Sequence, residues 1–196
     1  PAYRGAAPIQ RAIMNGERET GVTVFRLVGE VDAGPVLLSS RVEVGEEDTL
    51  GDLAEALAVE GSRLAVEGLE LFRKGRISFR EQQQDKATYA PKVTRQETGI
   101  RWEKPSQEVH NLVRSLNPYP GSHFYLRGIR TKLWRTRARP GEGSPGEVIG
   151  FMDGFPLVAC GEGSVELMEV QAEGRRRTDG AGWSRGRALK KGDMLN

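Results

Sequence analysis

The spacing of apolar residues predicts two helices in the first eighty residues. Pro8 can open a short helix, since its missing N–H costs nothing in a first turn, and Asn15-Gly16 ends it. A long helix is expected after Thr49, which with Asp52 resembles a capping box. Lys74-Gly75 ends this helix with a cation and a glycine. Its apolar stripe consists of Leu50, Leu53, Leu57, Leu64 and Leu71.

Two strands joined by a tight turn are predicted between these helices. Gly29, Gly34 and Pro35 favour the reversal. A third, short strand is expected after the long helix, at residues 76–80. The order helix, strand, turn, strand, long helix, strand indicates an α/β layer, without the opening strands of a complete doubly wound sheet. The residues expected to bury both arms of the hairpin are Val22, Val24, Val28, Val31, Val36 and Leu37.

The second half of the chain is predicted to be mostly β. Apolar periodicity disappears at residues 82–98, which we assign as a linker between a domain at residues 1–81 and one at residues 99–196. One helix is expected after Pro105. Five short strands and one helix fit a small barrel of the oligonucleotide-binding kind. The strands are expected at residues 124–126, 129–134, 148–152, 157–160 and 165–170.

Composition favours a cytoplasmic protein of one large or two small domains. The 196 residues are 37% hydrophobic, and no run approaches the ~18 apolar residues that a membrane span requires. The opening residues do not resemble a signal peptide. A single cysteine, Cys160, excludes an internal disulfide and a cysteine-based metal site. His110 and His123 stand in no metal-ligand spacing, so we expect no metal.

Charge is distributed unevenly along the chain. Residues 1–100 contain 13 Lys and Arg against 16 Asp and Glu, a net charge of −3. Residues 101–196 contain 16 against 11, a net charge of +5. A basic domain beside an acidic one suggests a polyanionic partner, although a modest surplus is also common on ordinary soluble domains.

Asp32 is the candidate catalytic residue, because the predicted turn holds its carboxylate between two buried strands. Such a carboxylate, partly removed from water, is a candidate proton acceptor. The alternative is an ordinary turn aspartate whose side chain binds backbone amides.

Basic residues of the second half form the candidate nucleic-acid site. On a strand, Arg130, Lys132 and Trp134 share one face, as expected of a surface that binds phosphates and stacks a base. A solvated barrel strand explains the same pattern. Lys92 and Arg95, in the predicted linker, are further candidates for a cleft between domains.

Two strings of residues resemble methionyl-tRNA formyltransferases. Residues 3–13 (Tyr-Arg-Gly-Ala-Ala-Pro-Ile-Gln-Arg-Ala-Ile) and the segment from Glu19 to Leu37 are similar to the second half of that family's catalytic domain. Residues 110–121 (His-Asn-Leu-Val-Arg-Ser-Leu-Asn-Pro-Tyr-Pro-Gly) resemble the start of its C-terminal domain. The resemblance covers nearly the whole chain, with both strings in the family's order.

The resemblance implies an enzyme of translation initiation. Such enzymes transfer a formyl group from 10-formyltetrahydrofolate to the amino group of methionyl initiator tRNA, and we expect a monomer. The implied fold is the C-terminal part of a Rossmann-like formyltransferase domain followed by an OB-like barrel that binds tRNA. Asp32 matches the family's catalytic aspartate, and Pro1 matches the last residue of a loop that borders the folate.

The chain departs from the family at one important point. The catalytic aspartate works beside an Asn and a His from an Asn-x-His motif, and the 196 residues contain no such motif. We therefore expect this chain to be inactive alone. Two alternatives remain. One is a related formyl-folate enzyme, either an amino-sugar nucleotide formyltransferase or a formyl-folate hydrolase. The other is a non-catalytic RNA-binding fragment.

Overall fold

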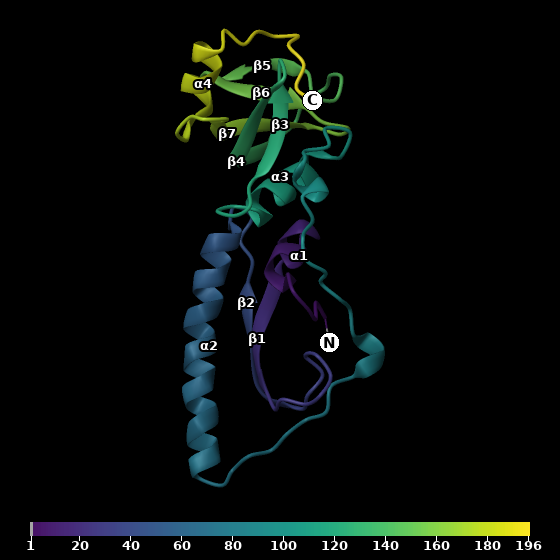
Figure 1. Cartoon of the computed structure of the whole chain (residues 1–196), viewed down its shortest axis with the longest axis vertical. Coiled ribbons are helices and arrows are strands. Elements are labelled where there is room, and N and C mark those ends of the chain that lie inside the picture. The colour runs from purple at the N-terminus through teal and green to yellow at the C-terminus, as the bar shows by residue number, and fades with distance from the viewer. Residues whose placement is uncertain (1) are drawn as a thin grey trace. The chain divides into compact units, whose positions relative to one another are not determined.

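The computed structural model describes residues 2–196 as two compact units, one ending at Val93 and the other formed by Thr94–Asn196 (Figure 1). The elements of the first unit are α1 (Pro8–Met14), β1 (Glu19–Phe25), β2 (Val36–Glu43), α2 (Leu50–Arg73) and the 3-10 turn η1 (Gln84–Lys86). Those of the second unit are η2 (Gln96–Thr98), α3 (Ser106–Ser115), β3 (Ser122–Leu126), β4 (Ile129–Arg139), β5 (Val148–Met152), β6 (Phe155–Ala159), β7 (Ser164–Ala172), β8 (Thr178–Asp179) and α4 (Gly180–Gly186).

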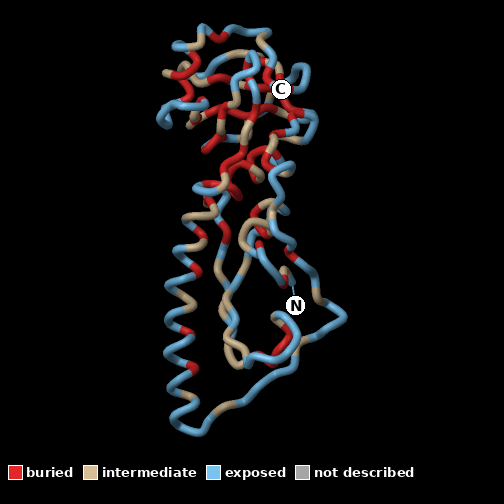
Figure 2. Tube along the Cα trace, in the orientation of Figure 1, coloured by how far each residue is buried: buried red, intermediate tan, exposed pale blue. Residues whose placement is uncertain are grey.

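In the first unit, α2 packs along the antiparallel pair β1–β2 (Figure 1). Two glycines permit the close approach. A Cβ atom at Gly61 would lie 3.3 Å from Val22 Cγ1, and one at Gly68 would lie 3.3 Å from Leu37 Cδ2. The small core of this unit contains Ile13, Val44, Leu53 and Leu57, whereas the outward side of α2 is exposed (Figure 2).

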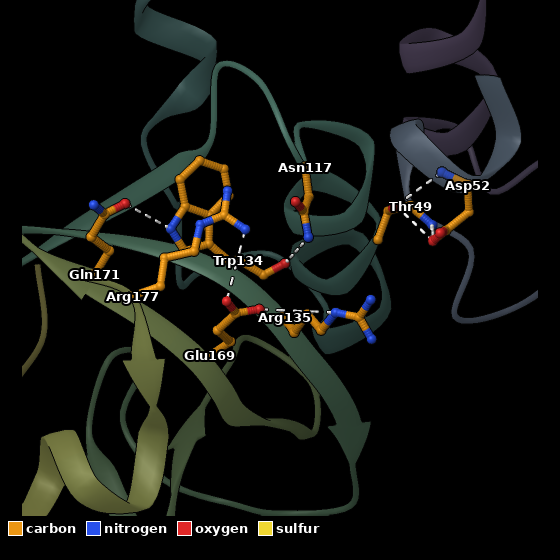
Figure 3. Close-up of polar contacts among 8 residues, drawn as sticks. All are labelled: Thr49, Asp52, Asn117, Trp134, Arg135, Glu169, Gln171 and Arg177. Carbon is orange, nitrogen blue, oxygen red and sulfur yellow. Dashed lines mark hydrogen bonds and ion pairs between the residues drawn. The ribbon is translucent and has the colours of Figure 1, made fainter. Parts of the chain in front are cut away.

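The predicted boundaries of α2 are confirmed by its caps. The Thr49 side chain accepts a hydrogen bond from the Asp52 backbone, and the Asp52 carboxylate accepts one from the Thr49 N–H at 3.0 Å (Figure 3). At the other end Lys74 is the C-cap and Gly75 has φ +63°, in the left-handed region that favours glycine. These signals were readable because each depends on residues three or fewer positions apart.

The predicted hairpin differs from the structure at its turn. Ten residues, 26–35, separate β1 from β2, so the connection is a loop and not a tight turn. Val28 and Val31, predicted to be buried, are 44% and 73% exposed. They lie in this loop, beyond the last pairs of the sheet, where the alternation of a strand no longer fixes which side chains point inward.

Two further segments of the first unit depart from the prediction. The short strand expected at residues 76–80 is reduced to a single antiparallel bridge between Val36 and Arg80. Within residues 2–93 the only ladder is the antiparallel pair β1–β2, so a parallel Rossmann sheet is not observed in this part of the chain. The polar stretch after Arg80 instead returns to the beginning of the chain, where Arg4 N–H donates to Thr88 O and Ala90 N–H to Arg4 O.

The second unit is an antiparallel sheet in the order β3-β4-β7-β6-β5, with β8 paired to β7. Among the described residues its two ends, β3 and β5, do not pair with each other, so the predicted small barrel of the oligonucleotide-binding kind is not confirmed. Its core includes Trp102, Phe124 and Trp183, whose rings meet edge to face with centroids 5.9 and 5.8 Å apart. Most of the buried positions in Figure 2 belong to this unit.

The second unit contains two helices where one was predicted. The expected helix is α3, and its apolar face contributes Val109 and Val113 to the core. The helix that was missed, α4, spans seven residues of which three are glycine, so it carries little helical signal. It begins because the Asp179 side chain accepts a hydrogen bond from Gly182 N–H at 2.6 Å.

Burial determines the chemistry of the single cysteine. Cys160 is 4% exposed, and burial raises the pKa of its thiol to about 12. Across residues 2–196, no helix is both long enough and apolar enough to cross a bilayer.

Candidate functional site

Asp32 lies in the loop between β1 and β2 and is half-buried as a residue. Its backbone has φ +52°, a left-handed conformation that aspartate tolerates better than most residues. The carboxylate oxygen Oδ2 accepts a hydrogen bond from Gly5 N–H at 3.1 Å. This backbone bond keeps the carboxylate against the segment that precedes α1.

Asp32 borders a cavity of about 290 Å³ in the first unit. Tyr3 and Arg4 contribute from the segment before α1, while Thr23 and Ser39 contribute from the strands. The side chains around the carboxylate are therefore mostly polar, with Arg80 and Gln82 completing the wall. A polar cavity that contains one carboxylate suits a small polar reactant better than an apolar ligand.

Two glutamine side chains fix the loop that carries Asp32. Gln82 Nε2 donates to the carbonyl of Asp32 at 3.0 Å and also to that of Gly34. Gln84 Nε2 donates to the carbonyl of Ala33 at 3.4 Å. The position of the carboxylate therefore depends on a segment fifty residues away, and these glutamines belong structurally to the Asp32 loop although the sequence placed them in the linker at residues 82–98.

Arg4 in turn holds both glutamines. Its Nη1 donates to Gln84 Oε1 at 2.7 Å and its Nη2 to Gln82 Oε1 at 2.8 Å. Only 6% of Arg4 is exposed, its Nε has no acceptor, and within the described chain no carboxylate pairs with it. A buried guanidinium without a counter-ion is costly, so its charge favours an anionic neighbour in this cavity.

Gly34 completes the loop for a steric reason. A Cβ atom at this position would lie 1.8 Å from the carbonyl oxygen of Arg26, so no other residue fits without a shift of the backbone. The close approach accompanies a hydrogen bond from Arg26 N–H to Pro35 O at 3.0 Å. The glycine and proline that the sequence assigned to a tight turn therefore close the base of a longer loop.

The second candidate surface lies on the β3–β4 hairpin. His123 pairs with Lys132 and Tyr125 with Arg130, so these four side chains share one face of the sheet. The His123 and Tyr125 rings meet edge to face with centroids 5.7 Å apart. Arg130 and Lys132 also border a cavity of about 210 Å³. We call His123, Tyr125, Arg130 and Lys132 the hairpin face.

Trp134 is enclosed by its neighbours rather than open to a base. It is 3% exposed, and its Nε1 donates to Gln171 Oε1 at 3.1 Å (Figure 3). The Arg177 guanidinium lies 3.6 Å from the ring centroid and Lys132 Nζ lies 5.0 Å from it. Stacking of a base on this indole would require Arg177 to leave, so the exposed aromatic of this face is Tyr125, at 42% exposure, which the sequence analysis did not single out.

The titratable groups of the hairpin face respond to burial and to one another. The pKa of His123 is lowered by burial first and then by Arg130, Arg95 and Lys132, although its Nδ1 lies 3.2 Å from Thr98 Oγ1. The pKa of Lys132 is lowered by burial and by Arg130 and Arg177. Cations alone supply the charge around His123, which suits an anionic ligand.

The remaining two basic candidates, Lys92 and Arg95, belong to different units. Lys92 is exposed in the first unit, where its carbonyl accepts from Arg11 Nη2 at 3.4 Å. Arg95 is exposed in the second unit, close enough to His123 to influence the pKa of that residue. Pro1 lies outside the described residues. Within residues 2–196, no group of three or more His, Cys, Asp or Glu side chains is placed to hold a metal ion.

Comparison with known families matches both parts of the chain. The family model described as "Formyl transferase" matches residues 1–69, and that described as "Formyl transferase, C-terminal domain" matches residues 92–188. The methionyl-tRNA formyltransferase of Paracoccus denitrificans is 42% identical over 96% of this chain and 61% of its own length. That of a Chelativorans species is 37% identical over the whole chain and 63% of its own length. The chain thus spans somewhat less than two thirds of these relatives.

Solved structures share the fold at lower sequence identity. HypX from Aquifex aeolicus, in complex with tetrahydrofolic acid, is 21% identical with a TM-score of 0.75 over the whole chain and 37% of its own. The methionyl-tRNA formyltransferase of Clostridium thermocellum is 18% identical with a TM-score of 0.57, over 72% of this chain and 61% of its own. These likenesses support the fold alone.

Proposed function

Since the chain belongs to the formyl transferase family, we propose that it is part of an enzyme that transfers a formyl group from 10-formyltetrahydrofolate to the amino group of methionyl initiator tRNA. The observation that carries this proposal is the placement of Asp32: its carboxylate borders a polar cavity and is fixed by Gly5 N–H and by the loop that Gln82 holds. Relatives that bear the methionyl-tRNA formyltransferase name align with 90% to 100% of this chain.

Asp32 would act on the proton of the attacking amine. Attack of an amine on a formyl carbon gives a tetrahedral oxyanion and a nitrogen that must lose a proton. The carboxylate has one oxygen engaged with Gly5 N–H, which leaves the other oxygen to accept a hydrogen bond from the amine or from a neighbouring imidazole. The buried charge of Arg4 favours negative charge within this cavity.

The oxyanion partners implied by the resemblance come from outside this sequence. The chain contains no Asn-x-His motif, and the relatives are longer than the part that aligns with it. We propose that residues of this unmatched part supply the Asn and the His, and that the 196-residue chain is inactive alone. Formyl transfer to methionyl-tRNA by the purified chain would contradict this.

We also propose the finer architecture that the family resemblance implies. Residues 1–81 would be the later part of a Rossmann-like catalytic domain and residues 99–196 an OB-like unit that binds tRNA, in a monomeric protein. The six-stranded antiparallel sheet and the basic hairpin face support the second assignment. Pro1 would border the folate.

The test is an Asp32→Asn change in the full-length enzyme. Loss of a proton-handling carboxylate should lower kcat for formylation by roughly 10² or more, with little change in the KM for tRNA. Asp85→Asn is the matched control, because Asp85 is exposed and lies outside the cavity. A turnover near that of the unchanged enzyme would remove Asp32 from the mechanism.

One alternative acceptor deserves the same assay. An N-formyltransferase from Helicobacter canadensis, whose structure is a complex with folinic acid and dTDP-3-aminofucose, shares the fold with a TM-score of 0.68. We favour tRNA, because the second unit presents cations and an exposed tyrosine on one face. Faster formylation of an amino-sugar nucleotide than of methionyl-tRNA by the full-length enzyme would reverse this preference.

A further inference from the structure

A second basic cavity lies in the second unit, between the end of β7 and α4. Its volume is about 310 Å³, and its wall includes three arginines, Arg175, Arg176 and Arg187, together with Thr178 and Trp183. We call it the arginine cavity. It shares Ala172, at the end of β7, with the cavity that Arg130 and Lys132 border, and the wall of that other cavity also contains Glu173.

The turn that presents Arg175 and Arg176 is held by its backbone. Arg175 N–H donates to Ala172 O at 3.0 Å, and the carbonyl of Arg175 accepts from Gln171 Nε2 at 2.9 Å. Gly174, at φ +70°, allows the tight reversal between these residues. The first two arginines of the cavity therefore stand on a fixed turn, whereas Arg187 comes from the C-cap of α4.

The charge of the arginine cavity is uncompensated. No carboxylate belongs to its wall, and in the part of the chain that the structure describes none of its three guanidiniums forms an ion pair. The contrast with Arg177 is instructive, because that neighbour lies 3.8 Å from Glu169 (Figure 3). Glu169 is thus directed to Arg177 and not to the cavity.

The polar groups of the wall are mainly donors. Arginine carries only N–H donors, in a planar fork that matches phosphate oxygens. Thr178 adds a hydroxyl, and Trp183 borders the cavity although its own indole Nε1–H is buried and has no acceptor among the described residues. A cavity with three arginines and no carboxylate in its wall fits an oxygen-rich anion better than a neutral or cationic ligand.

We propose that the arginine cavity binds a backbone phosphate of a nucleic acid. Its three arginines belong to a half of the chain that carries a net charge of +5, which favours a polyanion over a single small anion. This inference rests on the proposed function and names a second contact region for the same tRNA. It adds Arg175, Arg176 and Arg187 to the residues that bind the acceptor.

Indole signals of the whole chain provide the test. The chain has three tryptophans, so a ¹⁵N–¹H spectrum of the 196-residue protein shows three indole signals, which Trp183→Phe and Trp102→Phe would assign. Titration with a short single-stranded RNA should shift the Trp183 signal saturably. The Trp102 signal is the internal control, since this indole N–H is also buried without an acceptor but does not border the cavity. Absence of a saturable Trp183 shift would overturn the proposal.

Charge-removing variants give a second readout. The double change Arg176→Ala, Arg187→Ala should weaken RNA affinity about tenfold at low salt. It should also reduce the slope of log K against log salt by about 0.7 for each lost contact with a single strand. Arg185→Ala is the matched control, because Arg185 is an exposed arginine of α4 outside the cavity and its removal should change neither quantity. An unchanged affinity in the double variant would contradict the proposal.

Two further arms separate this inference from its alternatives. If inorganic phosphate shifts Trp183 with the same affinity as the RNA, the ligand is a free anion and the nucleic-acid assignment fails. If the RNA shifts Trp183 while the full-length enzyme does not formylate methionyl-tRNA, the cavity proposal stands and the proposed function falls. If the full-length enzyme formylates methionyl-tRNA and the double change leaves its KM for tRNA unaltered, the cavity proposal fails and the proposed function stands.

Discussion

The lowered pKa of His123 makes the stability of the folded chain depend on pH. Burial and the nearby cations lower its pKa in the folded chain, so between that pKa and about 6.5 the unfolded chain binds more protons than the folded one. The contribution of His123 to stability is therefore complete above about pH 6.5 and is lost as the pH falls below it.

We expect His123→Gln to remove this part of the pH dependence. Between pH 7.5 and 5.5 the free energy of unfolding of the unchanged chain should fall by more than that of the variant, as measured by urea denaturation at both pH values. His110 is present in both proteins, so the difference reports His123 alone. Equal losses in the two proteins would show that His123 does not couple to folding.

The sequence predicted a chain reversal around Asp32 but not the side chains that hold this loop in place. The reversal could be predicted because its glycines and its proline are close to Asp32 in sequence, and the structure places Asp32 in the loop that they close. Gln82, Gln84 and Arg4 act over separations of 48 to 80 residues, so no local pattern connects them with the loop. For the same reason the enclosure of Trp134 by Arg177 was not visible.

At the scale of elements, α2 depends on its N-terminal cap. Thr49→Ala removes an acceptor for the Asp52 N–H and should destabilise the helix by about 1 kcal/mol. Hydrogen exchange of the amides at the start of α2 would measure the loss. Ser62→Ala is the control within the same helix, because that exposed side chain binds only the Ala58 carbonyl. Equal protection in both variants would contradict a role for the cap.

The glutamine contacts of the Asp32 loop make a second prediction at this scale. Gln82→Ala with Gln84→Ala removes three hydrogen bonds to loop carbonyls, so the loop should open more often. At about 0.5–1.5 kcal/mol for each bond, trypsin should cut after Arg26 at least about tenfold faster. Limited proteolysis followed by mass spectrometry would measure the rate.

Gln83→Ala is the matched control for this experiment. Gln83 lies between the two glutamines and is exposed, and its side chain makes no hydrogen bond to the loop. Its removal should leave the cleavage rate unchanged. Faster cleavage in the control, or an unchanged cleavage rate in the double variant, would show that other contacts hold the loop.

The elements themselves were predictable to the extent that their signals are local. The capping box of α2 and the alternating strands of the second unit could be read from neighbouring residues. The absence of pairing between β3 and β5 could not be read, because contacts between strands more than twenty residues apart leave no spacing in the sequence. α4 was missed because a capping aspartate before a glycine-rich stretch also describes a turn.

At the scale of the whole molecule, the uneven charge predicts salt-dependent binding. The second half carries a net charge of +5, and basic side chains border two of its cavities. The affinity of the chain for tRNA should fall steeply as salt rises, and alanine at Arg130 and Lys132 should reduce the slope by about one for each lost contact. A filter-binding or fluorescence titration at several salt concentrations would measure it.

Arg76→Ala, in the first unit, is the control for the salt experiment. Arg76 is exposed, so its removal changes the total charge by the same amount as Arg130→Ala without touching the second unit. An affinity that does not vary with salt would discard nucleic acid as the partner of this unit. An equal change of slope in the control would show that only the total charge matters.

The protected thiol of Cys160 has a practical consequence for the whole molecule. Because it is the only cysteine and burial keeps it as the unreactive acid form, a thiol introduced on an exposed loop would be the single site for a maleimide dye. Two such positions, one in each unit, would allow the distance between the units to be followed by energy transfer without first removing the native cysteine.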